Sequence, residues 1–295
     1  MCLIVVLSRV VPGAPLIVGG NRDERFERPA RPMTVLREEP PRTLGGRDLK
    51  ADGTWLAVNE AGVVAGLTNR PVPGGPDATK RSRGAFPLAL TSRSTAAEAV
   101  EAFAKETRPD EYNGAWLLVG DRTSLFSVEL AGSGEVQVVE LPPGVYVQEN
   151  RAMSAPSNKA DHVRGLLAGI ESMGQAEAVE RLRAVLADHQ IPPAEPAAEE
   201  PTVEEVPGEA APAESPVVAE DGTGVSPADG SAAEEEPRKP PPPEVRAACV
   251  HIEEFGTRWS GVVVVPSDPT LHPDLRYSDG PPCRRPYIGT RPLWG

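Results

Sequence analysis

The second residue of the chain combines two groups that can catalyse acyl transfer. Cys2 follows Met1, and a small residue after the initiator methionine normally permits its removal, which would leave Cys2 with a free α-amine. Such an amine has a pKa of about 7.7–8.0, so this single residue would carry both a thiol nucleophile and a base. The alternative interpretation is a small buried cysteine at the start of a strand.

Two further polar positions stand where apolar strands are expected to end. Asn21, Arg22, Asp23 and Glu24 directly follow one such strand, and an Arg–Asp pair there can be fixed in orientation by bidentate hydrogen bonds. Asn69 closes another strand, and its side-chain amide can donate to an oxyanion. The ordinary alternatives are a loop with a salt bridge at residues 21–24 and a turn cap at Asn69.

The charge of the chain is concentrated in one segment. The net charge of the 295 residues is −13, which argues against a nucleic-acid binder because phosphates require a basic face. Residues 192–245 hold 14 acidic and two basic side chains, 13 prolines, and no Leu, Ile, Met, Phe, Trp or Tyr. Such a segment buries too little apolar surface to fold, so we expect a disordered acidic insertion. It is either a regulatory or partner-binding segment or simply a solvated insertion.

Cysteine and histidine usage predicts neither a disulfide framework nor a metal site. The three cysteines are too few and too scattered for a framework or a Cys-only zinc site, and the four histidines show no i, i+4 pairing; these residues are Cys2, Cys249, Cys283, His162, His189, His251 and His272. Cys249 and Cys283 are interpreted as structural. No apolar run reaches the ~20 residues of a membrane span, and residues 3–7 are too short for a signal peptide, which favours a reducing, cytoplasmic setting.

Hydrophobic patterning predicts an α+β domain. Apolar runs and turn signals indicate strands at 3–7, 16–20, 55–58, 63–68, 115–119, 124–130, 135–141, 145–148, 247–253 and 258–265. Helical periodicity is expected at 95–105, 157–171 and 175–188, whereas the segment after residue 20 up to Pro41 and residues 71–84 are expected to be loops. Two antiparallel meanders with helices between and after them suggest a central sandwich. Residues 1–191 and 246–295 are expected to form a single domain.

The order of several short motifs resembles the NRDE family, also called the transport and Golgi organisation protein 2 family. The matching pieces are Met1-Cys2 before an apolar strand, Asn21-Arg-Asp-Glu24, Arg28-Pro29, Gly53-Thr-Trp-Leu56, Gly62-Val-Val-Ala-Gly-Leu-Thr-Asn69, Arg81-Ser-Arg-Gly84 and Phe255-Gly-Thr-Arg258. Each motif alone is weak, but the ordered set covers nearly the whole chain outside the acidic segment.

The resemblance implies an N-terminal-nucleophile (Ntn) hydrolase fold, a four-layer αββα sandwich. In the wider superfamily of penicillin V acylases and bile-salt hydrolases, an N-terminal Cys attacks an amide, an Arg and an Asp flank it, and Asn groups hold the oxyanion. The corresponding residues here are Cys2, Arg22, Asp23, Asn69, Asn150 and Arg258. The chemistry needs no metal or cofactor, and nearby Arg22 and Arg258 are expected to favour the thiolate.

For two of these residues, Asn150 and Arg258, the role that the resemblance implies has an alternative. Asn150 ends Val147-Gln-Glu-Asn150, where the family has Gly-Leu-Ser-Asn, so the loop of the second oxyanion donor departs from the family pattern. Arg258 could instead be a strand residue that pairs with Glu253 or Glu254.

Two functions from different classes follow from the resemblance. The first is an amidohydrolase acting on the carbon–nitrogen bond of a small acyl or amide substrate. The second is a non-catalytic carrier for haem or acyl-CoA-type lipids, to whose homeostasis the family has been linked, with arginines on carboxylates or propionates. A weaker third possibility is a scaffold that acts through the insertion. A hydrolase requires an unblocked Cys2, whereas a carrier tolerates its replacement by alanine.

Overall fold

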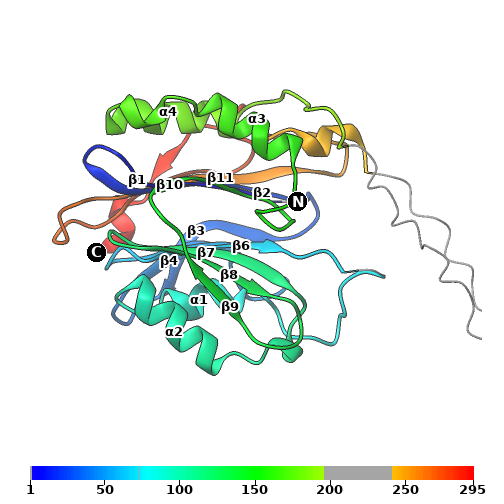
Figure 1. The fold of residues 1–295 in the computed structure, drawn as a ribbon, viewed down its shortest axis with the longest axis horizontal. Helices are drawn as coiled ribbons and strands as arrows, with labels where there is room; N and C mark the ends of the chain where they lie inside the picture. Colours follow the sequence, from blue (N-terminus) through cyan, green and yellow to red (C-terminus); the bar gives the residue numbers. More distant parts are fainter. Residues whose placement is uncertain (1, 73, 196–240) are drawn as a thin grey trace, which may run out of the picture. The chain divides into compact units, whose positions relative to one another are not determined.

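Two antiparallel sheets lie face to face with helices outside each (Figure 1). The computed structural model describes residues 2–72, 74–195 and 241–295. These residues, apart from Pro241, belong to one compact unit, Met1–Glu195 with Pro242–Gly295. Most of the predicted acidic insertion, residues 196–240, lies outside the described residues. Among the residues described, no helix is long and apolar enough to cross a membrane.

The first sheet pairs strands from the beginning of the chain with strands from its end. Its six strands run in the order β10-β1-β2-β11-β12-β13. Their bounds are Cys2–Val11 for β1, Ala14–Arg25 for β2, Gly144–Gln148 for β10, Phe255–Val265 for β11, Asp274–Ser278 for β12 and Ile288–Gly289 for β13. Strand β2 therefore lies between β1 and β11, and the tetrapeptide at residues 21–24 is central in the sheet.

The second sheet is a meander of seven consecutive strands, β3 to β9. Their bounds are Ala30–Arg37 for β3, Thr43–Asp48 for β4, Leu56–Asn59 for β5, Val64–Asn69 for β6, Ala115–Gly120 for β7, Leu125–Leu130 for β8 and Gln137–Glu140 for β9. The β5–β6 hairpin turns at Gly62, where φ is +95°, a conformation that glycine adopts at little cost.

In the part of the chain that the structure describes, four α-helices complete the layers. Helices α3 (Asn158–Leu166) and α4 (Gln175–Leu186) cover the first sheet, and α1 (Ala85–Leu90) and α2 (Ala96–Glu106) cover the second (Figure 1). Single 3₁₀ turns occur at Pro109–Glu111, Ile170–Ser172, Pro243–Arg246 and Arg291–Trp294. The Thr95 and Ser157 side chains cap α2 and α3 by accepting backbone N–H groups. The predicted four-layer αββα sandwich is confirmed.

The side chains of β1 alternate between the two faces of its sheet, and both faces are buried. Leu3, Val5 and Leu7 face α3 and α4, whereas Ile4 and Val6 face the second sheet. All five side chains are at most 3% exposed. Because neighbouring residues of a strand point to opposite faces, a run that is apolar throughout must be covered on both sides.

Three sequence-based expectations about the elements were wrong. The segment expected to be a loop up to Pro41 contains β3, an edge strand with register shifts, where Pro32 and Arg residues are tolerated. Residues 247–253 are not a strand, although Ala247 to Val250 are buried. The predicted helix at 157–171 ends at Leu166, and a 3₁₀ turn follows at Ile170–Ser172. The remaining predicted strands and helices are present, with shifted ends.

Candidate active site

A cavity of about 640 Å³ opens where the strands of both sheets end. Cys2, Arg22 and Asp23 line it from the first sheet, and Asn69 lies at the end of β6 in the second. Asn150 lines it from the segment after β10. The fold thus brings together five of the six residues named from the sequence.

Cys2 is anchored at its backbone nitrogen. This nitrogen donates to the Asn150 Oδ1 atom at 2.7 Å. The antiparallel pairing of β1 with β10, in which Ile4 faces Gln148, places Asn150 beside the start of β1. The Asn150 Nδ2 atom in turn donates to the Asn69 backbone carbonyl at 2.7 Å. Asn150 therefore links the Cys2 nitrogen to the end of β6, and its carbonyl oxygen faces the nitrogen that we expected to act as base.

The surroundings of the Cys2 thiol disfavour its anion. The residue is partly exposed, but dense packing around the sulfur raises the pKa of the thiol by desolvation. Arg22 and a hydrogen bond from the Asp23 backbone N–H oppose this shift, while the Asp23 carboxylate reinforces it. The thiol pKa is therefore raised, contrary to the expectation that positive charge would favour the thiolate.

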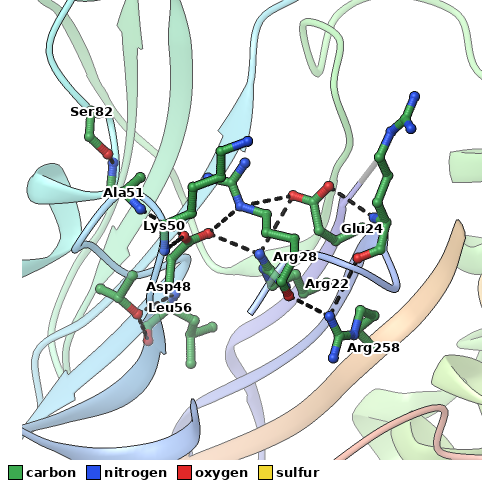
Figure 2. A network of polar contacts seen from close by, with 12 residues as sticks. Arg22, Glu24, Arg28, Asp48, Lys50, Ala51, Leu56, Ser82 and Arg258 are labelled. Atoms are coloured by element: carbon green, nitrogen blue, oxygen red, sulfur yellow. Dashed lines mark hydrogen bonds and ion pairs between the residues drawn. The ribbon is translucent and has the colours of Figure 1, made fainter. Parts of the chain in front are cut away.

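Arg22 is held by partners that the sequence did not reveal. Its guanidinium lies 2.9 Å from Asp48 Oδ2 and 4.6 Å from the centre of the Trp55 ring. Arg28 binds the same Asp48 oxygen at 2.7 Å, and Glu24 lies 3.5 Å from Arg22 (Figure 2). Burial opposes ionisation of Asp48, but hydrogen bonds from Arg28 and the Ala51 backbone outweigh it and lower its pKa. Arg22 is thus a fixed, neutralised cation at the cavity wall.

Asp23 lies deeper and is held from β11. Its carboxylate is 4% exposed, and Thr257 donates its hydroxyl hydrogen to Oδ1 at 2.6 Å. Burial raises the pKa of Asp23, against the attraction of the buried Lys159 and the hydrogen bond from Thr257. Asn21, the first residue of the tetrapeptide, instead donates to the carbonyls of Leu186 and Ala248 and fastens β2 to its surroundings.

Arg258 is the sequence-predicted residue that the structure does not bring to the cavity. Asp23 pairs with Thr257 and Arg22 with Trp259, so Arg258 is the extra residue of a β-bulge. Its guanidinium donates to the backbone carbonyls of Phe26, at 2.8 Å, and Arg28 (Figure 2). The bulge re-aims the side chain, so Arg258 fixes the loop after β2 and is absent from the cavity lining formed by the described residues.

The main residues missed from the sequence are Asp48 and Thr257. Asp48 ends β4, inside a region without strand signals, and no local pattern distinguishes it from a surface aspartate. Thr257 belongs to the Phe255–Arg258 motif, but only the pairing of β2 with β11 shows that its hydroxyl faces Asp23. The signal that could have found Asp48 and Thr257 is that Arg22 and Asp23, if buried, each require a hydrogen-bonding partner.

Comparisons with known proteins found a matching family model, curated relatives and solved structures of low sequence identity. The family model described as Transport and Golgi organisation 2 matches residues 1–272. The Transport and Golgi organization protein 2 homolog of Bos taurus is 26% identical over 264 residues, which are 86% of this chain and 83% of that protein. Among solved structures, an N-acylethanolamine-hydrolyzing acid amidase ortholog from Caenorhabditis elegans is 13% identical, with a TM-score of 0.47, over 61% of this chain and 85% of that one. Penicillin V acylase from Agrobacterium tumefaciens is 13% identical, with a TM-score of 0.39, over 95% and 83%.

The family assignment rests on the sequence match. It spans the cavity residues from Cys2 to Asn150 and the β11 motif with Thr257 and Arg258. The matched stretch also exceeds nine-tenths of the 295 residues. The chain belongs to the Transport and Golgi organisation 2 family.

Proposed function

We propose that this chain hydrolyses the amide bond of a small acyl-amide substrate, with Cys2 as nucleophile. The observation that carries the proposal is the anchoring of the Cys2 nitrogen by Asn150 Oδ1 at 2.7 Å, beside a cavity large enough for a small molecule. Asn150 Oδ1 is placed to accept from this nitrogen and so to orient it as a free amine once Met1 is removed. A reducing, cytoplasmic setting that keeps Cys2 a thiol is part of this proposal.

The proposed reaction begins with removal of Met1, which converts the Cys2 nitrogen into an amine. The neutral amine accepts the thiol proton while the sulfur attacks the substrate carbonyl carbon. This route suits a thiol whose pKa is raised, because no standing thiolate is required. Asn150 orients the amine, and the Asp23 carboxylate stabilises the ammonium that forms.

The oxyanion needs a donor on the opposite side of the cavity. The Asn69 side chain makes no hydrogen bond within the described part of the chain, so its amide is available to the developing charge. Collapse of the tetrahedral intermediate breaks the carbon–nitrogen bond, and the ammonium gives its proton to the leaving amine. Water, deprotonated by the same amine, then hydrolyses the thioester and releases the acid.

The cavity rim favours a substrate that carries an anionic group. Arg28, Lys50, Lys80, Arg81 and Arg83 line it. Arg28 binds Asp48 and Arg81 binds Glu111, so these two cations are already paired with carboxylates. Within the described residues Arg83 has no carboxylate partner and donates only to the Gly114 carbonyl at 2.9 Å. Burial and the nearby Arg28 lower its pKa, which indicates an uncompensated cation. A carboxylate or similar anion on the substrate would relieve this repulsion.

The same rim supports the alternative function, a carrier of haem or of acyl-CoA-type lipids. The propionates of haem and the phosphates of coenzyme A are anions that such cations can bind. A carrier has no use for the Cys2 amine, so dependence on Cys2 separates the two functions.

The test is turnover and acyl-enzyme formation by protein that begins at Cys2. Intact mass first establishes loss of Met1; retained Met1 or an acetylated amine would contradict the catalytic proposal. A panel of N-acyl amides, with and without a carboxylate, is then assayed, and the thioester is trapped by mass spectrometry. Cys2→Ala should lower kcat by at least about 1000-fold, whereas His272→Gln, a change outside the cavity lining of the described residues, should retain activity. Haem binding with no turnover, unchanged in Cys2→Ala, would establish the carrier instead.

A further inference from the structure

Four metal-ligating side chains meet beside the start of β11. His189 follows α4, Cys249 and His251 precede β11, and Cys283 lies between β12 and β13. One ligand atom from each residue can be chosen so that all four lie within 4.8 Å of one another. Residues from three distant segments thus converge on one point.

The distances in this cluster fit a tetrahedral zinc ion. Zinc binds sulfur at about 2.3 Å and histidine nitrogen at about 2.0–2.1 Å, so a tetrahedron has edges of about 3.8 Å between sulfurs and about 3.5 Å between sulfur and nitrogen. The Cys249 and Cys283 sulfurs are 3.8 Å apart. His251 Nε2 lies 3.6 Å from the Cys249 sulfur and 3.2 Å from that of Cys283.

The fourth ligand is already oriented. His189 Nδ1 lies 3.1 Å from the Cys249 carbonyl oxygen, which only accepts, so Nδ1 carries the proton and Nε2 keeps its lone pair. A backbone carbonyl that fixes the tautomer in this way is typical of metal-bound histidines. The His189 and His251 rings lie 4.9 Å apart between centroids, which places both beside the sulfurs.

We propose that His189, Cys249, His251 and Cys283 bind a structural Zn²⁺ ion. Two thiolates and two imidazoles are a ligand set that selects zinc, and four protein ligands leave no open position for a substrate. Each cysteine loses its proton to solvent when it binds the ion. From the sequence we expected no metal site, because we looked only for zinc sites made of cysteines alone and for histidine pairs at i, i+4. The four ligands here are a mixed set that neither pattern describes.

The ion would fasten the chain where the acidic insertion departs. His189 lies before residues 196–240 and Cys249 after them, so the metal closes that long loop. The Cys249 backbone N–H already donates to the Asp188 carbonyl at 2.8 Å. The neighbouring Val250 N–H donates to Thr257 Oγ1, and Thr257 donates to Asp23. The zinc site thereby supports the segment that orients Asp23.

The experiment is metal binding by the full chain, stripped with a chelator and kept reduced. We expect one Zn²⁺ per chain and a rise in the thermal midpoint on addition of zinc. Co²⁺ should give the thiolate charge-transfer band and the intense d–d bands of a tetrahedral S₂N₂ site. Cys283→Ser and His251→Gln should weaken zinc binding by at least about 100-fold.

Two matched substitutions control for the residue types. His272 stacks on Trp294, outside the cluster, and Cys2 lies in the active site. His272→Gln and Cys2→Ser should therefore bind zinc as the unmodified chain does. Absence of stoichiometric zinc, unchanged binding in both ligand variants, or a Cys249–Cys283 disulfide in unreduced protein would each overturn the proposal.

Discussion

Thr257 donates its hydroxyl hydrogen to the buried carboxylate of Asp23, with 2.6 Å between Oγ1 and Oδ1. The same Oγ1 accepts the Val250 backbone N–H at 2.9 Å. One hydroxyl group therefore connects β11, the segment before it and the carboxylate of Asp23 in the candidate site. Its loss affects both the packing of that segment and the charge at the site.

Thr257→Val removes this hydroxyl while keeping the β-branched shape. We expect a loss of about 1–3 kcal/mol in the free energy of unfolding, because a buried carboxylate and a buried N–H each lose a partner. The pKa of Asp23 should rise further, since the Thr257 hydrogen bond lowers it. Urea unfolding measures the first effect and infrared titration of the carboxyl the second. Thr257→Ser keeps the hydroxyl and should restore the pKa; equal pKa values in both variants would contradict this assignment.

The Arg22–Asp48–Arg28 cluster predicts a pH-dependent stability. Folding lowers the pKa of Asp48, so its contribution is complete above the unfolded value of about 3.9 and is lost as pH falls through the folded pKa. At neutral pH Asp48→Asn should cost about 2 kcal/mol, because two arginines lose a charged acceptor.

Urea unfolding at pH 7 and at the acid limit of the native state measures this contribution. The difference between the parent chain and Asp48→Asn should shrink at the lower pH. Asp52→Asn is the control, since Asp52 is exposed and pairs with Arg47 on the surface, where an ion pair contributes little. If the difference in unfolding free energy between the two chains does not change with pH, the charge of Asp48 makes no contribution to stability.

Alkylation of Cys2 should report its raised pKa. Desolvation by burial is the largest influence on this thiol, so the pH midpoint of iodoacetamide labelling should lie above the ordinary value of about 8.5. Arg22→Gln should raise the midpoint further, because Arg22 lowers the pKa. Arg258→Gln, the same change at a residue bound to backbone carbonyls, should leave it unchanged. Peptide mapping separates Cys2 from the other cysteines, and a midpoint below the ordinary value would refute the structural account.

Replacement of residues 196–240 by a short Gly-Ser linker should leave the thermal midpoint within about 2 °C. The composition of this segment offers little apolar surface to bury. The described flanks are already joined, because Arg246 Nε donates to the Pro192 carbonyl at 2.9 Å. Differential scanning calorimetry of the parent chain and the deletion variant decides the matter, and a fall of several degrees would assign a structural role to the segment.

Buried, regularly patterned elements were predictable from the sequence, and edge elements were not. Residues 3–7 and 16–20 are apolar because both faces of β1 and β2 are covered, so the signal was strong. Strand β3 lies at a sheet edge, where proline and arginine are tolerated, and its pattern resembles a loop. Ala247 to Val250 are buried against other elements without pairing in a sheet, which apolar patterning alone cannot distinguish from a strand.

The candidate site was predictable where its residues stand within recognisable motifs. Cys2, Arg22, Asp23, Asn69 and Asn150 line one cavity, but their orientation depends on contacts across the fold. The bulge in β11 turns Arg258 away from the cavity, and a bulge of one residue leaves no trace in apolar patterning. The raised pKa of Cys2 could not be predicted either, because it depends on burial and not on the count of nearby charges.

The position of β2 between β1 and β11 also constrains the order of events during synthesis. Residues 2–25 leave the ribosome long before their partner strand, residues 255–265, is translated. Until then one edge of β2 lacks its partner, and exposed strand edges invite pairing with other chains. Asp23 also waits for Thr257 before its carboxylate is oriented. The nascent chain therefore cannot complete the candidate site before β11 is made, and folding should be slow, as expected for contacts between residues far apart in sequence.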